Sequence, residues 1–130
     1  TVSEPEKGSV FRYIDNAPKT KPNKHGEPSK ISAGDGLTLW NPLVSGGKQV
    51  GHLQANCWAT RNAKSFPNAE WECVGTWVFG SGTLTATARV GPKGTEGSIT
   101  GGTGSYVGAR GVFVSNESTS PTVTTITLIE

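Results

Sequence analysis

Long apolar runs, helical periodicity and abundant charge are all absent from this sequence. No apolar run approaches the roughly 20 residues that a membrane-spanning helix needs. No stretch repeats apolar residues at i, i+3, i+4 and i+7, so the sequence predicts no long helix. Charged residues make up only 17% of the chain, which argues against a solvated, disordered protein. These absences leave a folded domain built from short elements.

Residue patterns that mark common functions are also scarce. A nucleic-acid binder usually shows a basic stripe interleaved with aromatic residues. Here the lysines near the N-terminus sit among prolines and glycines, at Lys19, Lys21, Lys24 and Lys30. The two histidines, His25 and His52, have no partners at metal-coordinating spacing. The sequence therefore predicts no nucleic-acid site, no metal site and no cofactor.

Glycine, proline, threonine, serine and valine are plentiful, and together they indicate short strands joined by turns. The chain has 18 glycines and 8 prolines in 130 residues, and its 33% of hydrophobic residues is low for a packed helical protein. A chain of this length suits one hydrophobic core. We therefore predict a single all-β domain that spans residues 1–130.

Alternation of apolar and polar residues with a period of two predicts about eight strands. They cover residues 9–15, 37–43, 49–60, 71–79, 83–90, 96–100, 109–115 and 122–129. A long polar loop, residues 16–36, separates the first two strands, and residues 101–104 are predicted to form a tight corner without regular structure. Eight short strands with hairpin turns are typical of a β-sandwich or an up-and-down barrel, and periodicity does not decide between them.

The two cysteines lie on consecutive predicted strands. If the connection between those strands turns near Ser65, Cys57 and Cys73 fall opposite each other, where an antiparallel pair can be bridged. We predict a disulfide, which favours a secreted or extracytoplasmic protein. The alternative is two reduced cysteines packed as small apolar groups in a cytoplasmic protein. A first residue of Thr rather than Met agrees with removal of a secretory signal, and equally with a shortened recombinant chain.

Three motifs in a specific order resemble one superfamily of β-barrel proteins. A Gly-Asp turn at Gly34 and Asp35 is followed by residues 39–43 (LWNPL), a Val-Gly pair at Val50, and the glycine-rich residues 99–111 (ITGGTGSYVGARG). This pattern resembles allene oxide cyclases and dirigent proteins, and a bacterial member of their superfamily in particular, from about residue 10 to the C-terminus. The resemblance implies an eight-stranded antiparallel β-barrel, often trimeric, with an apolar cavity for a reactive or flexible small molecule.

The resemblance also assigns polar site residues. When Ile14 sets the frame of the first strand, Asp15 falls where dirigent proteins carry a functional aspartate, and Tyr13 falls where plant allene oxide cyclases carry a glutamate. Because that glutamate is missing, the resemblance argues against allene oxide cyclase activity itself. Asn41 matches an asparagine that helps to hold a water molecule in the cyclases. Asp15, Tyr13 and Asn41 are the predicted catalytic residues. Alternatively, Asp15 and Asn41 form turns and Tyr13 is an ordinary half-buried tyrosine.

Alternate residues of a barrel strand face inward, and the frame fixed by the resemblance predicts an apolar, aromatic cavity wall. The predicted substrate-binding residues are Phe11, Leu39, Leu53, Cys57, Trp77, Phe79, Leu84, Val90 and Phe113. A lining of this composition with a few polar groups is usual for a small-molecule site. Four residues are predicted to point outward: Trp40, Trp58, Val74 and Val78. With the trimeric habit of the family they favour a homo-oligomer, either a trimer or a dimer.

Three functions fit these expectations. The leading hypothesis is a cyclase or isomerase of natural-product biosynthesis that folds a flexible, largely apolar substrate for ring closure, with Asp15 polarising a carbonyl or moving one proton. The second is dirigent-type stereochemical control of a coupling reaction without bond-making by the protein itself. The third is a carrier that binds a small molecule without turnover. Turnover separates the first from the third, and an altered stereoisomer ratio separates the second from the first. No membrane partner is predicted.

Overall fold

The computed structural model describes residues 1–15, 30–116 and 121–129, and most of them belong to strands. The strands are β1 (Val2–Glu4), β2 (Val10–Ile14), β3 (Gly36–Ser45), β4 (Lys48–Ala59), β5 (Trp71–Phe79), β6 (Gly82–Gly91), β7 (Gly94–Gly104), β8 (Arg110–Asn116) and β9 (Thr122–Ile129). One short 3-10 helix, η1 (Phe66–Asn68), lies between β4 and β5. The described residues contain no helix with the length and hydrophobicity of a membrane span.

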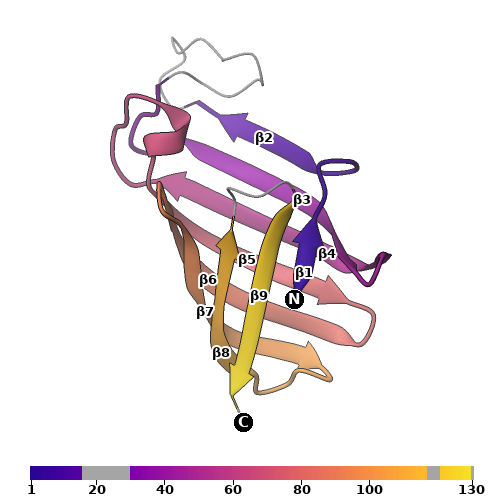
Figure 1. The fold of residues 1–130 in the computed structure, drawn as a ribbon. Coiled ribbons are helices and arrows are strands. Elements are labelled where there is room, and N and C mark those ends of the chain that lie inside the picture. The colour runs from indigo at the N-terminus through magenta and orange to yellow at the C-terminus, as the bar shows by residue number, and fades with distance from the viewer. Residues whose placement is uncertain (16–29, 117–120, 130) are drawn as a thin grey trace.

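The strands form one antiparallel sheet that closes on itself. From β3 to β9 each strand pairs with the next along the chain, and β1 pairs with both β9 and β3. β2 pairs with the first half of β3 and is the extra strand of a closed eight-stranded barrel. Figure 1 shows the strands wrapping around a common interior, with β1 beside β9. The prediction of an eight-stranded antiparallel β-barrel is confirmed.

The closing strand, β1, has only three residues and is missing from the strands that alternation predicts. Ser3 pairs with Val123 of β9 on one side and with Val44 of β3 on the other. Pro5 follows, and because proline has no N–H to donate to a ladder, the strand ends there. The chain then turns, with Gly8 at φ 85°. This turn lets β2 pair with the other half of β3.

The glycine-rich segment contradicts the predicted corner at residues 101–104. These residues continue β7, which ends at Gly104, and the corner lies at residues 105–108. The glycines permit close approach between chain segments: a Cβ atom at Gly102 would lie 2.4 Å from the carbonyl oxygen of Tyr106. Gly104, at φ 62°, has a conformation that favours glycine where the chain enters the corner.

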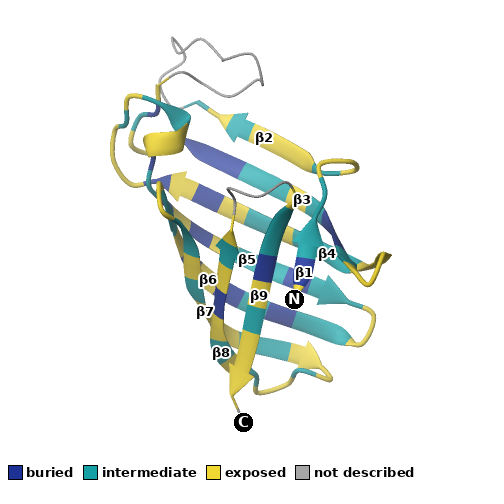
Figure 2. Cartoon of the chain, viewed as in Figure 1, coloured by how far each residue is buried: buried dark blue, intermediate teal, exposed yellow. Residues whose placement is uncertain are grey.

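Buried and more exposed residues alternate along several strands, as the colours of Figure 2 show, because successive side chains of a strand point to opposite faces. The large buried side chains of the interior include Ile31, Leu43, Trp71, Trp77, Leu84, Ile99 and Phe113. Removing such apolar surface from water is the main stabilising contribution to the fold, at roughly 25 cal/mol per Å². Trp40, Trp58 and Val74 are exposed, as predicted, whereas Val78 is only partly exposed. His52 also lies on the outside, where its ring stacks on Trp40 with centroids 4.8 Å apart.

The two cysteines form the predicted disulfide. Cys57 of β4 lies opposite Cys73 of β5 in the strand register, and their sulfur atoms are bonded. Both residues are buried in the barrel interior. The connection between the two strands, which includes η1, turns back as the sequence predicts.

Replacing both cysteines, Cys57→Ala with Cys73→Ala, should lower the free energy of unfolding by about 3 kcal/mol. The reason is that the bond closes a loop across a sequence separation of 16, and a loop of about this length gives that value in the chain-entropy description. Urea unfolding followed by tryptophan fluorescence measures the change. Wild-type protein kept in a reductant should lose a similar amount. A double variant as stable as oxidised wild type would contradict the prediction.

A methyl group at Gly97 should destabilise the barrel by about 1–3 kcal/mol, the usual cost of overpacking. A Cβ atom there would lie 2.2 Å from the carbonyl oxygen of Thr87 and 2.6 Å from the ring of Phe113. Gly101→Ala, on the same strand, is the matched control, because its nearest neighbour would be at an ordinary 3.6 Å. Thermal unfolding of the two variants should show a clearly lower midpoint for Gly97→Ala only. Equal midpoints would show that the strands separate easily at this point.

Candidate functional site

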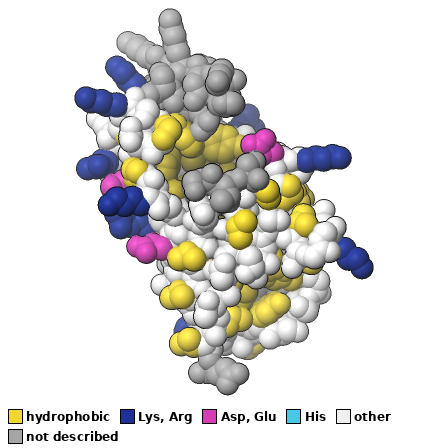
Figure 3. All heavy atoms as spheres, viewed as in Figure 1, with side chains coloured by type: hydrophobic (Ala, Val, Ile, Leu, Met, Phe, Trp, Pro, Cys, Tyr) yellow, Lys and Arg dark blue, Asp and Glu magenta, His cyan; other side chains and the backbone are white. Residues whose placement is uncertain are grey.

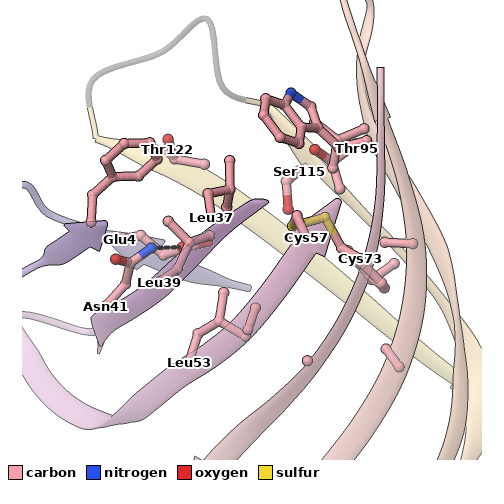
Figure 4. A pocket seen from close by; sticks show the side chains of 18 of the residues that line it. Glu4, Leu37, Leu39, Asn41, Leu53, Cys57, Cys73, Thr95, Ser115 and Thr122 are labelled. Carbon is pink, nitrogen blue, oxygen red and sulfur yellow. Dashed lines mark hydrogen bonds between the residues drawn. A yellow bond between two sulfur atoms is a disulfide. The ribbon is translucent and has the colours of Figure 1, made fainter. Parts of the chain in front are cut away.

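A cavity of about 310 Å³ lies inside the barrel, and every one of the nine strands contributes to its lining. Figure 4 shows the cavity from close by, with Leu37, Leu39 and Leu53 along one wall and the disulfide along another. In Figure 3, hydrophobic side chains surround a hollow at the end of the molecule near β2 and η1. The volume lies at the lower end of the range for small-molecule sites.

Aromatic rings form two groups in the cavity lining. Phe66, from η1, contacts Phe11 of β2 with ring centroids 5.9 Å apart and Trp71 of β5 at 5.7 Å. Further along β5, Trp77 packs edge-to-face against Phe113 of β8 at 4.7 Å. Rings in such arrangements present both faces and edges to a bound molecule. The cavity can therefore hold a flat or folded apolar body.

The main polar group of the lining is the carboxyl of Glu4, the last residue of β1. Its Oε1 accepts a hydrogen bond of 2.8 Å from Nδ2 of Asn41 on β3, as Figure 4 shows. Its Oε2 accepts one of 2.9 Å from the hydroxyl of Thr124 on β9. Two accepted bonds are the pattern expected of an ionised carboxylate, which has no proton to donate. These bonds fix the orientation of the Glu4 carboxyl beside the apolar cavity.

A short chain of hydroxyl groups extends this site toward β8. The Thr124 and Ser115 hydroxyl oxygens lie 2.7 Å apart. Because the single proton of Thr124 is donated to Glu4, Ser115 must be the donor in this second bond. Thr124 is fully buried, whereas Glu4, Asn41 and Ser115 line the cavity. Glu4 is also the only charged side chain among the described lining residues.

Most of the predicted substrate-binding residues line this cavity. They are Phe11, Leu39, Leu53, Cys57, Trp77, Val90 and Phe113, together with the predicted catalytic residue Asn41. Phe79 and Leu84 do not line it. Leu84 is buried in the core, and Phe79 packs on Tyr106 with ring centroids 5.9 Å apart. Alternation correctly gives their inward direction but not their depth along the barrel.

The other two predicted catalytic residues, Tyr13 and Asp15, are not among the described lining residues. The Tyr13 hydroxyl donates a hydrogen bond to Oδ2 of Asp35, which also accepts one of 2.9 Å from the backbone N–H of Ser32. Asp35 is completely buried, and its backbone bonds to Ala59. These contacts tie β2 to the Gly-Asp turn before β3. Tyr13 therefore has a clear structural role next to the barrel wall.

Sequence reasoning misses Glu4. It lies in a three-residue strand, too short for alternation to detect, and before the segment that carries the family resemblance. Its position two residues after the apolar Val2, with Pro5 following, is the only local signal. His25, one of the two histidines, lies outside the described residues. Among the described residues, no group of three or more His, Cys, Asp or Glu side chains could hold a metal ion.

No protein-family model and no curated protein matches this sequence, but solved structures match its fold. Pyocyanin demethylase superposes with a TM-score of 0.67 over 93% of this chain and 99% of that chain, at 22% identity. The pterocarpan synthase dirigent protein PsPTS1 superposes at 0.54 over 89% of this chain and 88% of its own, at 21% identity. A second, GePTS1, does so at 0.53 over 89% and 80%, at 20% identity.

These likenesses define the class of fold. The chain is a β-barrel of the allene oxide cyclase and dirigent type, which confirms the fold that the motifs predict. At this level of identity the likeness extends to the fold alone. The cavity, with its aromatic walls and few polar groups, has the composition of a small-molecule site.

The pairing of Tyr13 with Asp35 should make the protein sensitive to alkali. Burial, the hydrogen bond to Asp35 and the nearby negative charges raise the pKa of Tyr13 above its usual value of 10.0. Its contribution to stability is thus complete below about pH 10 and is lost progressively as the pH rises toward its folded pKa. At neutral pH, Tyr13→Phe should be less stable than wild type, because buried Asp35 loses a hydrogen-bond donor. Between neutral and high pH, however, the variant should lose less stability than wild type does.

Urea unfolding at about pH 8 and about pH 11, on either side of the ordinary tyrosine pKa, measures this effect. Tyr106→Phe, which replaces the only other tyrosine, is the control and should keep the wild-type loss of stability. If Tyr13→Phe and wild type lose the same stability between the two conditions, the buried pair does not control the alkaline response.

Proposed function

We propose that this barrel binds a largely apolar small molecule and acts on it as an enzyme of the isomerase or cyclase type, with Glu4 moving a proton. The observation that supports this is the Glu4 carboxylate, the one charged group of the described lining, which lies beside an aromatic cavity with both of its oxygens held in place. Glu4 takes the part that the sequence assigns to Asp15, because Asp15 is not among the described lining residues.

The cavity walls would supply much of the rate enhancement by holding the substrate in a reactive shape. Keeping two reacting ends in a near-attack geometry can contribute roughly 7–11 kcal/mol. The lining of leucines, alanines and aromatic rings has few groups that would compete for a reactive intermediate. Enclosure by such a wall also keeps water away from the reacting atoms.

The polar groups would supply the proton transfer. Glu4 can accept a proton from one atom of the substrate and return it to another, which leaves the composition of the substrate unchanged. A positioned acid or base of this kind typically contributes 10²–10⁴-fold. Asn41 donates one N–H to Glu4 and keeps a second N–H and its carbonyl oxygen for the substrate. This second N–H could polarise a carbonyl beside the proton that moves.

A second candidate is dirigent-type control of a coupling reaction that starts elsewhere. It is supported by the fold likeness to the pterocarpan synthase dirigent proteins and by a lining with only one described charged group. The likeness to pyocyanin demethylase is to an enzyme, so the fold alone does not separate the two candidates. In the dirigent case, removal of the Glu4 charge would change the ratio of product stereoisomers without lowering the total amount of product.

The disulfide bears on where the protein works. Disulfides persist in oxidising compartments and are rare in the cytoplasm. The Cys57–Cys73 bond therefore supports a place outside the cytoplasm, which we include in the proposal.

The experiment that tests the proposed function compares the small molecules of the producing organism with those of a strain that lacks the gene. The strain is complemented with wild type, Glu4→Gln or Asp15→Asn. We expect a less cyclised or unisomerised precursor to accumulate in the strain, and wild type and Asp15→Asn to restore the product. Glu4→Gln should restore at most about one part in a hundred of the activity, as expected for loss of a general base.

Glu4→Gln preserves the shape of the side chain, so it also tests whether Glu4 is needed only for structure. The new amide can accept from Thr124 and donate to Asn41 once the amide of Asn41 turns over. The thermal midpoint should therefore change little. A folded Glu4→Gln that restores the product fully would refute a chemical role for Glu4, and an unchanged profile in the deletion strain would favour a carrier.

A further inference from the structure

We infer that the molecule bound in the barrel carries a positive charge on an otherwise apolar, largely flat body. A protonated amine or a heteroaromatic cation has this chemistry. This inference rests on the proposed function and specifies the class of substrate. It follows from the charge of Glu4, from the acceptor oxygen of Ser115 near it and from the aromatic rings of the lining.

The charge of Glu4 has no opposite charge within the described lining. Its two hydrogen bonds come from neutral groups, Asn41 and Thr124. A carboxylate has about four acceptor positions, and the described residues fill two of those of Glu4. Because an unpaired charge beside an apolar cavity is costly, a cationic ligand would be favoured there over a neutral one.

The Ser115 hydroxyl, like the Glu4 carboxylate, presents a hydrogen-bond acceptor to the cavity. The Ser115 proton is donated to Thr124, which in turn donates to Glu4. The oxygen of Ser115 therefore offers only lone pairs to a bound molecule. Glu4 and Ser115 come from β1 and β8, and both line the cavity. Together they form an acceptor site that suits a donor N–H or a positive charge and repels a carboxylate or phosphate.

The aromatic lining adds a second preference for cations. Ring faces attract a positive charge within about 6 Å. Phe66 lies between Phe11 and Trp71, so three rings stand together in the lining. Leu39 and Leu53 complete an apolar surface for the rest of the molecule. A flat cation could stack on these rings while its charged end approaches Glu4.

The test uses three probes of nearly identical shape and different charge: 1-methylquinolinium, 1-methylnaphthalene and 1-naphthoate. Each is titrated into wild type, Glu4→Gln and Glu72→Gln near neutral pH, with tryptophan fluorescence or calorimetry as the readout. Glu72→Gln is the matched control, because it removes the same charge from an exposed position on the outer face of β5. Thermal unfolding of each variant shows that it is folded before it is titrated.

We expect wild type to bind 1-methylquinolinium about tenfold more tightly than 1-methylnaphthalene, as one charge-assisted or cation–π contact would give. The naphthoate should bind most weakly. Glu4→Gln should lose most of the preference for the cation and keep its affinity for 1-methylnaphthalene, whereas Glu72→Gln should behave as wild type. The comparison of the three probes on wild type is decisive even if Glu4→Gln fails to fold.

Two results would overturn the inference in different ways. If 1-methylnaphthalene or the naphthoate binds wild type at least as tightly as the cation, the substrate class is wrong, while an apolar binding barrel is retained. If none of the three probes binds, both the substrate class and the proposed small-molecule function are refuted. A preference for the cation that Glu72→Gln removes as well as Glu4→Gln would place its origin in overall charge rather than in the cavity.

Discussion

The barrel is held closed by one short strand. β1 pairs with β9 on one side and with β3 on the other, and without it both neighbours would be edges with unpaired backbone groups. Three residues can form few backbone hydrogen bonds, and the Glu4 side chain adds two more, one to Asn41 on β3 and one to Thr124 on β9. The same carboxylate therefore joins the two sides of the barrel and provides the charge in the cavity.

Because the Glu4 side chain also helps to close the barrel, its orientation is part of the fold. A carboxylate beside apolar groups is stabilised only if hydrogen bonds replace the water that it loses. Here the bonds that do so also close the sheet, so the orientation of Glu4 is fixed when the barrel folds and does not have to be set when a ligand binds. A group held in this way needs little reorganisation during a reaction, which is the main advantage of a preorganised site. In the proposed function, the contacts that close the barrel would also keep Glu4 in position for proton transfer.

The sequence predicts the strands in which apolar and polar residues alternate. β5 was expected at 71–79 and lies there, and the register that follows from it brings Cys57 opposite Cys73. Two local features of the fold are not predicted by this alternation. β1 is too short to show it, and residues 101–104 remain in β7 because their glycines allow close approach between segments instead of breaking the strand. Glycine content alone does not distinguish a strand whose glycines allow close approach from a turn that breaks the strand.

The candidate site is harder to predict because alternation gives the direction of a side chain but not its depth. Phe11 and Tyr13 share a face of β2, yet Phe11 lines the cavity and Tyr13 reaches the buried Asp35. The resemblance predicts Asp15 as the catalytic acid, whereas the acid that is hydrogen-bonded to Asn41 is Glu4. Glu4 lies there because β1 and not β2 pairs with β9 and completes the barrel beside Asn41. The choice between the two acids therefore depends on which strand closes the sheet, a long-range contact that no local pattern records.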